Sequence, residues 1–209
     1  MNHWVQEAIY HWLVFLRKIR YSRWLAGPQH RHLARAELRR FYVGLNGFLQ
    51  SLEVDYWLAY GTLLGFHRDS DLILGDADID FGLRVEDYQK VLDYQHRLPP
   101  GYQLIDTSHK HGGPKLYVRC GLFAADLYFY CSQGEHLHIY LNSHYVSDRT
   151  PVARHLIQPT QPAHFLGQPT RIPNCSEELL LWTYGYLGSD GRLDPETGFW
   201  HPPQKQSPP

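Results

Sequence analysis

Three aspartates that alternate with apolar residues constrain this chain more than any other feature of its sequence. Asp76, Asp78 and Asp80 occur in the run DADIDF. Side chains on a β-strand alternate between its two faces, so a strand here would project all three carboxylates from one face. Like charges this close repel one another and raise a carboxyl pKa, whereas a divalent cation removes the conflict. Such hard oxygen ligands suit Mg²⁺ or Mn²⁺; a solvated acidic edge or turn is the alternative.

A Gly-Thr pair shortly before the aspartates favours phosphate chemistry. Gly61 and Thr62 follow an aromatic strand predicted at 56–60 and start a predicted strand-to-helix turn, where free backbone N–H groups can hold a phosphate. Arg68 adds a cation with bidentate geometry between this turn and the acidic strand. A phosphate turn followed closely by a carboxylate strand contains the minimum for metal-assisted phosphoryl transfer.

The composition is that of one globular domain whose main partner is not a nucleic acid. Hydrophobic residues make up 43% of the 209 residues, and the formal net charge is −1. Binding to a phosphate backbone normally shows as an excess of positive charge. No apolar run approaches the ~18 residues of a membrane span, and the first residues lack the pattern of a signal peptide. The three cysteines form no CxxC pair. We therefore expect a cytoplasmic protein.

Hydrophobic periodicity predicts a mixture of helices and strands, the α+β class. Helices are predicted at 4–24, 33–52 and 85–97, and from Ser176, which is expected to cap the last helix before Gly185 or Gly188 ends it. Strands are predicted at 56–60, 72–74, 79–83, 115–120, 122–131 and 136–141. The Pro-rich stretch 151–173 is expected to be irregular, and the tail 201–209 disordered.

The first predicted helix is amphipathic and carries a basic cluster between Arg17 and Arg23. Cations suit the C-terminal end of a helix, where the macrodipole is negative. A helix that contacts a membrane surface or a partner is the alternative, and it would make the protein peripheral to the membrane. We divide the chain into this N-terminal helix (1–27), one domain (28–200) and the tail (201–209).

Histidine pairs offer a second possible metal site. The chain has 14 histidines, and the pairs His109/His111 and His136/His138 have the i, i+2 spacing that brings two imidazoles to one face of a strand. No third ligand is fixed by the sequence. We therefore favour scattered surface histidines over a histidine-based metal site.

The motif around these aspartates resembles the signature of the LicD/fukutin family. That signature reads GTLLG, two residues, Arg, four residues, then IPWDDDIDF. This chain has GTLLG at 61–65, Arg68, Ile73 and DADIDF at 76–81, and the spacing matches without a gap. Looser similarities to the C-terminal pattern of the family are FLG at 165–167, IPN at 172–174 and YG at 184–185.

The resemblance implies a nucleotidyltransferase fold of the DNA polymerase β superfamily. In this fold a small mixed β-sheet carries a Gly-Ser/Thr turn and a DxD strand, and helices flank the sheet. Carried over by position, Asp78 and Asp80 are the metal-binding pair, with Asp76 as a further candidate ligand. Gly61 and Thr62 correspond to the phosphate turn.

The superfamily also has a third carboxylate on a neighbouring strand, and Asp126 is the candidate here. It stands within the apolar run GLFAADLYFY, where a buried acid is costly without a metal ion or a cation beside it. A salt bridge to a nearby Arg or Lys is the alternative explanation. Lys115 and Arg119, on the preceding predicted strand, could neutralise phosphate charge, and we favour Lys115 for this role.

Some positions depart from the family pattern. Ala77 replaces the second Asp of the signature, but it would face away from the metal. Leu74 and Gly75 replace Pro-Trp and would reshape the wall of the pocket. The chain also looks short for the family, so we expect that an acceptor-recognition insertion is missing.

The implied activity is an Mg²⁺- or Mn²⁺-dependent phosphotransferase. It would move phosphocholine or a polyol phosphate from a CDP-linked donor to a sugar hydroxyl of a glycan. Asp78, Asp80 and Asp126 would hold the metal, and Asp126 would accept the proton of the hydroxyl. Two alternatives remain open: a nucleotidyltransferase that adds NMP to a small molecule or a protein, and a non-catalytic nucleotide-binding scaffold.

Overall fold

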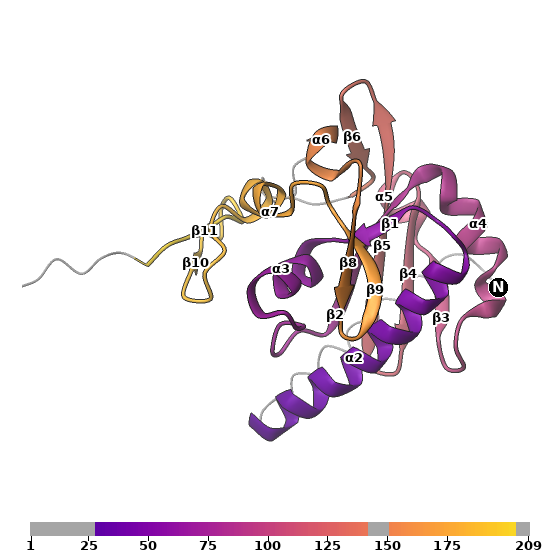
Figure 1. Ribbon diagram of the computed structural model, residues 1–209, viewed down its shortest axis with the longest axis horizontal. Coiled ribbons are helices and arrows are strands. Elements are labelled where there is room, and N and C mark those ends of the chain that lie inside the picture. The colour runs from indigo at the N-terminus through magenta and orange to yellow at the C-terminus, as the bar shows by residue number, and fades with distance from the viewer. Residues whose placement is uncertain (1–27, 142–150, 204–209) are drawn as a thin grey trace, which may run out of the picture.

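The computed structural model describes residues 28–141 and 151–203, and there the chain combines a mixed β-sheet with flanking helices (Figure 1). The predicted helix 4–24 and residues 204–209 of the predicted tail lie outside the described residues. The strands of the main sheet are β1 (Tyr56–Leu58), β2 (Asp78–Arg84), β3 (Gln103–Asp106), β4 (Lys115–Cys120), β5 (Phe123–Gln133), β6 (His136–Ile139) and β7 (Val152–Ala153). Two small hairpins are formed by β8 (Gln161–Phe165) with β9 (Gln168–Ile172) and by β10 (Arg192–Leu193) with β11 (Trp200–His201).

The helices are α2 (Pro28–Ser51), α3 (Tyr60–Asp69), α4 (Tyr88–Asp93), α5 (Ser108–His111), α6 (Arg154–Ile157) and α7 (Ser176–Tyr184). Short 3₁₀ turns, η1 (Val85–Asp87) and η2 (Gln95–Arg97), flank α4. The predicted second helix is confirmed as α2, and it begins five residues earlier than expected.

The main sheet has the strand order β1-β2-β5-β4-β3, and β6 and β7 extend it beside β5. β2 and β5 run parallel, whereas the other pairs are antiparallel. β5 pairs with β2 on one side and with β4 on the other, so it lies at the centre of the sheet. The predicted strands at 79–83, 115–120, 122–131 and 136–141 are confirmed within two residues at each end.

Helix α2 lies across one face of the sheet beside the β8–β9 hairpin (Figure 1). Its fully buried residues Leu38, Tyr42, Leu45 and Leu49 recur every three or four positions, which places them on one side of the helix. Tyr42 stacks on Phe81 of β2, with ring centroids 5.9 Å apart. This apolar contact holds α2 on the strand that carries the aspartates.

The loop between α3 and β2 is anchored to α2 through Asp71. The Nε of Arg39 donates to Asp71 Oδ1 at 2.8 Å, and Nη1 of Arg35 lies 3.0 Å from Oδ2. The backbone N–H of Leu72 also donates to Asp71 Oδ1 at 2.8 Å. Although burial opposes ionisation, the hydrogen bonds from Arg39 and Leu72 lower the pKa of Asp71. The strand predicted at 72–74 is wrong: the N–H of Leu72 bonds to this side chain, and the carbonyl oxygen of Ile73 accepts from the N–H of Asp76 in a turn.

The Pro-rich stretch 151–173 forms regular secondary structure, whereas the sequence predicted an irregular segment. It forms β7, α6 and the β8–β9 hairpin. Pro162 and Pro169 occupy exposed positions of this two-stranded hairpin, where a missing N–H is tolerated. Phe165, on the same hairpin, is buried and packs edge-on against Tyr42 at 5.2 Å. More exposed and less exposed residues alternate along β8, and the contact between Phe165 and Tyr42 holds the hairpin on α2. The prolines obscure this alternation in the sequence.

Two further details differ from the sequence predictions. The stretch 85–97 is divided into η1, α4 and η2, because Val91 alone is fully buried and no continuous apolar face holds a longer helix. Ser176 does not cap α7, since its hydroxyl donates to the carbonyl oxygen of Pro173 at 2.8 Å. The predicted end of α7 is confirmed at Gly185, whose φ of 80° suits glycine.

The first two strands depend on a glycine that is covered by an indole ring. Trp57 of β1 and Gly82 of β2 are register partners, and Trp57 is fully buried. A Cβ on Gly82 would collide with the indole ring of Trp57. Gly47 on α2 provides a contrast, because a Cβ there would have no neighbour within 4 Å.

We expect Gly82→Ala to lower the free energy of unfolding by about 1–3 kcal/mol, because the added methyl group overpacks the core. The matched control Gly47→Ala should be neutral or raise it by up to about 1 kcal/mol, since Ala favours a helix. Urea denaturation followed by circular dichroism measures both values. Equal effects of the two substitutions would show that Trp57 does not constrain this position.

Candidate active site

The parallel pairing of β2 with β5 brings the predicted acids together. Asp80 and Asp126 are register partners on the two strands, so their side chains share one face of the sheet. Asp78 lies two residues before Asp80 on the same face. These three residues and Asp76 line one cleft with a volume of about 720 Å³. The fold thus collects on one surface four carboxylates that come from two separate parts of the sequence.

Asp76 reaches this cleft from outside the sheet. The sequence predicts that it lies on the strand, but β2 begins at Asp78. Asp76 instead follows a turn that is closed by its own N–H, which donates to the carbonyl oxygen of Ile73 at 3.1 Å. Gly75 within this turn has a φ of 98°, a conformation that a side chain would strain. Glycine in place of the Trp of the signature is therefore required by the turn.

Gly61 and Thr62 bind the acidic strand in this structure. The backbone N–H of Gly61 donates to Asp80 Oδ2 at 3.2 Å, and Thr62 Oγ1 accepts from the backbone N–H of Asp80 at 2.9 Å. Thr62 is buried, whereas Gly61 is among the residues that line the cleft. A Cβ on Gly61 would lie 3.2 Å from Asp76 Oδ2, so glycine leaves room for the carboxylates. The N-terminal end of α3, which carries a partial positive charge, is thereby placed against the acids.

Asp126 forms a salt bridge with Lys115, which was one of the two explanations that the sequence offered for an acid within this apolar strand. The Nζ of Lys115 lies 2.7 Å from Asp126 Oδ1, and the lysine side chain is only 4% exposed. The same Nζ lies 3.3 Å from the centroid of the Tyr128 ring. Arg119, the other candidate cation, donates instead to Gln103 Oε1 at 2.7 Å. The cleft is lined by Asp126 and Tyr128, and Lys115 stands behind them.

Arg68 lies in the wall of the cleft, as the motif predicts. Its guanidinium group is bound to Asp69, with Nη2 3.1 Å from Oδ2, and its side chain is 24% exposed. It can therefore reach a ligand from its present position. A phosphate would compete with Asp69 for the guanidinium group.

Burial and the charges of neighbouring carboxylates raise the pKa of two of these acids, Asp76 and Asp80. The pKa of Asp80 is raised well above its usual value, first by burial and then by the charges of Asp78, Asp126 and Asp76. Burial and the charge of Asp78 raise the pKa of Asp76 to about 7. The positive charge of Lys115 acts in the opposite direction and lowers the pKa of Asp80. We call the cleft surface that carries Asp76, Asp78, Asp80 and Asp126 the acidic face. A bound cation would reduce the repulsion between these carboxylates.

The donor set fits Mg²⁺ or Mn²⁺, because it consists of hard carboxylate oxygens. In residues 28–141 and 151–203, however, no three His, Cys, Asp or Glu side chains already form a metal-binding group. Side chains on the acidic face would have to turn toward an ion. Of the histidine pairs, His109 and His111 lie on α5, contrary to the strand spacing predicted for them, and His136 and His138 lie on β6.

An aromatic wall faces the acids, and the sequence patterns alone did not reveal it. Tyr60 and Tyr128 form one part, with ring centroids 4.7 Å apart. The other part comes from the C-terminal end of α7 and the segment that follows it, which contribute aromatic side chains to the lining of the same cleft: Tyr184, Tyr186 and Trp200. The signal was the density of aromatic and glycine residues between 182 and 200.

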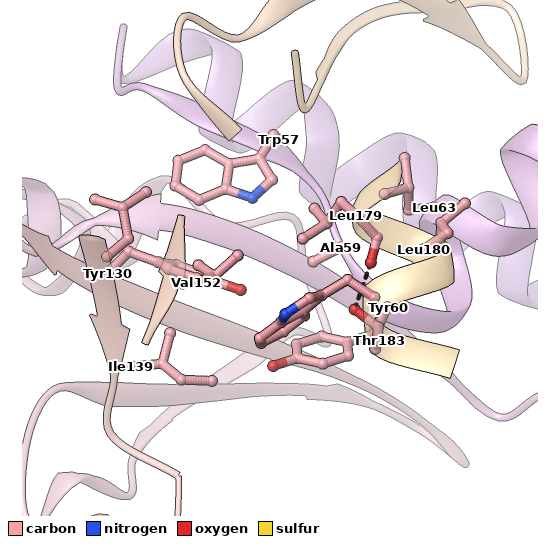
Figure 2. Close-up of a pocket in the computed structure, with 12 residues that line it drawn as sticks. Trp57, Ala59, Tyr60, Leu63, Tyr130, Ile139, Val152, Leu179, Leu180 and Thr183 are labelled. Atoms are coloured by element: carbon pink, nitrogen blue, oxygen red, sulfur yellow. Dashed lines mark hydrogen bonds between the residues drawn. The ribbon is translucent and has the colours of Figure 1, made fainter. Parts of the chain in front are cut away.

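A second, smaller cavity lies on the other side of Tyr60. Figure 2 shows the indole ring of Trp57 beside side chains from α7, and the hydroxyl of Thr183 donates within that helix to the carbonyl oxygen of Leu179 at 2.8 Å. Its volume is about 20 Å³, and its lining is mostly apolar. This space is close to that of one water molecule, so the larger cleft is the candidate active site.

Comparison with known proteins agrees with the motif. The family described as LicD/FKTN/FKRP, nucleotidyltransferase domain, matches residues 53–175, which is more than half of the chain. The chain belongs to this family. The matched range contains the Gly-Thr turn, the acidic strand and Asp126.

One curated relative is an uncharacterized protein of Rickettsia typhi (strain ATCC VR-144 / Wilmington). It is 34% identical over 90 residues, which cover 41% of this chain and 26% of the relative. The match thus spans about a quarter of the length of that protein. As for membrane contact, no helix in the described parts of the chain combines the length and hydropathy that a membrane span requires. The proposed contact through residues 1–27 lies outside the described residues.

We expect Asp80→Asn to stabilise the protein in EDTA, with a gain that grows as the pH rises from about 4.5 to 7.5. A raised pKa means that folded Asp80 retains its proton after the unfolded chain has lost it. The wild-type protein therefore loses stability over this range, and the Asn variant avoids that loss. Urea denaturation should show a gain of roughly 1–3 kcal/mol at pH 7.5.

The matched control is Glu135→Gln, which removes an exposed acid at the β5–β6 turn. This change should have little effect on the free energy of unfolding at any pH in the range. If Asp80→Asn were destabilising at pH 7.5, Asp80 would not be electrostatically strained in the folded protein.

Proposed function

We propose that this protein is a metal-dependent phosphotransferase that moves a phospho-alcohol from a CDP-linked donor to a hydroxyl group of a glycan. The observation that carries the proposal is the acidic face, with four carboxylates in one cleft, inside the range that matches the LicD/FKTN/FKRP family. Family membership indicates a phosphotransferase-like role. Phosphocholine and polyol phosphates are the groups that we expect to be transferred.

In this scheme, Asp78 and Asp80 would hold Mg²⁺ or Mn²⁺, with Asp76 as a further candidate ligand. The ion supplies positive charge for the phosphoryl oxygens and for the leaving CMP. Asp126 accepts the proton of the attacking hydroxyl. Its salt bridge to Lys115 supports this role by fixing the position of the carboxylate, which lines the cleft.

The phosphate groups have several candidate partners around the acids. Arg68 lies in the cleft wall and can exchange Asp69 for a phosphate oxygen. Gly61 lies at the N-terminal end of α3, where the helix dipole favours an anion. Thr62 and Lys115 lie behind the cleft surface, so we assign them to support Asp80 and Asp126 in preference to direct phosphate contact.

The aromatic wall suits a planar ring of the donor. Trp200 is 37% exposed and lines the cleft together with Tyr186, and flat aromatic faces stack on nucleobases. We place the base of the donor against this wall, with its diphosphate on the acidic face. The cleft volume of about 720 Å³ is large enough for a nucleotide-sized ligand.

A nucleotidyltransferase activity is the second candidate, and the description of the matched family as a nucleotidyltransferase domain favours it. Both chemistries need the same carboxylates and differ in the phosphorus atom that is attacked. Release of CMP identifies the phosphotransferase, and release of pyrophosphate identifies the nucleotidyltransferase. A non-catalytic scaffold would bind a nucleotide without a metal ion and release neither product.

Thermal unfolding with Mg²⁺ and a panel of CDP-choline, CDP-ribitol, CDP-glycerol and nucleoside triphosphates tests the proposal. A ligand at ~100 times its Kd adds about 2.7 kcal/mol, which raises the Tm by very roughly 5–10 °C. We expect one CDP-alcohol to give a Mg²⁺-dependent shift that is lost in Asp78→Asn and retained in Glu135→Gln. Asp78→Asn should also lower CMP release by at least about a hundredfold. A response to triphosphates alone would favour the nucleotidyltransferase.

We expect Trp200→Ala to raise the KM for the nucleotide donor about tenfold or more, with a smaller effect on kcat. Loss of one stacking partner costs about 1–3 kcal/mol of binding. Trp200→Phe should retain most of the affinity, because it keeps an aromatic face. Initial-rate kinetics with varied donor and acceptor measure the effect, and a change confined to the KM of the acceptor would assign the wall to the acceptor.

A further inference from the structure

Lys115 is a cation built into the rear of the acidic face. Its Nζ contacts Asp126 Oδ1 at 2.7 Å and the Tyr128 ring at 3.3 Å from the centroid, and its side chain is 4% exposed. A lysine is rarely buried this deeply unless it is paired. Here the carboxylate and the aromatic face together replace the water that the ammonium group would otherwise bind.

The backbone fixes this lysine in place. Lys115 and Tyr128 are register partners on β4 and β5, and Asp126 lies two residues from Tyr128 on the same face. At the start of β4, the N–H of Lys115 donates to Ser108 Oγ at 3.1 Å, and its carbonyl oxygen accepts from the N–H of Thr107 at 3.0 Å. The ammonium group is therefore positioned by the sheet and by the turn before it.

The cation is placed where it affects any metal ion on the acids. Asp126 is the register partner of Asp80, so Lys115 stands at one side of the acidic face. Enzymes with two metal ions hold them about 3.5–4 Å apart on shared carboxylates. An oxygen that already binds an ammonium group at 2.7 Å is a poor ligand for a divalent ion, because the two cations would repel each other at close range.

We propose that Lys115 takes the place of a second divalent ion, so that the acidic face holds one divalent ion, on Asp78 and Asp80. Lys115 acts through Asp126 and is a positioning residue: it supplies a fixed positive charge and orients the carboxylate. This inference rests on the proposed function, because it concerns the metal ion of that same site. It specifies the metal stoichiometry, which the family motif does not.

The test is to count the Mn²⁺ ions bound by the full chain, using isothermal titration calorimetry and electron paramagnetic resonance of free Mn²⁺. We expect the wild-type protein to bind one ion. Lys115→Met removes the charge and keeps an unbranched apolar side chain, so it should bind a second Mn²⁺ or bind the first at least about tenfold more tightly. Lys115→Arg keeps the charge and should still bind one ion, which distinguishes a charge effect from altered packing.

Two wild-type ions, or unchanged stoichiometry and affinity in Lys115→Met, would overturn the inference and leave the proposed function standing. No wild-type binding of Mn²⁺ would instead contradict the metal dependence of the proposed function itself. Near-UV circular dichroism checks that the variants fold. If Lys115→Met does not, the double variant Lys115→Met/Asp126→Asn, which replaces both charges, serves as the second test. It should still bind one ion, and loss of that ion would identify Asp126 as an essential ligand.

Discussion

The candidate active site depends on the parallel pairing of β2 with β5. This register places Asp80 beside Asp126, although 45 residues separate them in the sequence. A slip by one residue would turn one of the two carboxylates to the opposite face of the sheet. The intervening chain, which includes α4, β3 and β4, returns on the other side of β5 and delivers Lys115 to the same place. One strand pairing thus positions both the acids and their counter-ion.

Neighbouring carboxylates raise the pKa of Asp76 and Asp80, and the surrounding structure opposes the repulsion between the acids in specific ways. The N–H of Gly61 donates to Asp80, and Lys115 neutralises Asp126. Asp71, bound by Arg35 and Arg39, anchors the loop that leads to the acidic strand. Strained charge clusters of this kind are typical of functional sites, where a ligand relieves the strain.

Much of the architecture could be predicted from periodicity, and the failures have local causes. Helix α2 was predictable from the 3.6-residue period of its apolar residues and β2 from the alternation of polar and apolar residues, whereas β4 and β5 were predictable from their content of β-branched and aromatic residues. The β8–β9 hairpin was not, because its prolines suggested an irregular segment while their exposed positions in a two-stranded hairpin made them harmless. The segment 72–74, expected to be a strand, is a loop in which the backbone N–H of Leu72 bonds to the side chain of Asp71. Hydrophobic periodicity does not predict such a contact between a side chain and the backbone.

The sequence by itself determined the family: the alternating aspartates, the Gly-Thr pair and the spacing to Arg68 sufficed to identify it. These features are local: they depend on neighbouring positions in the sequence and are the same wherever the strand or turn lies in the fold. Only the tertiary structure decided that Asp126 is bound by Lys115, that Thr62 bonds to the acidic strand, and that the segment around Trp200 lines the cleft. Those contacts join residues far apart in the chain. They are set by strand register and by packing against the sheet, which sequence spacing does not reveal.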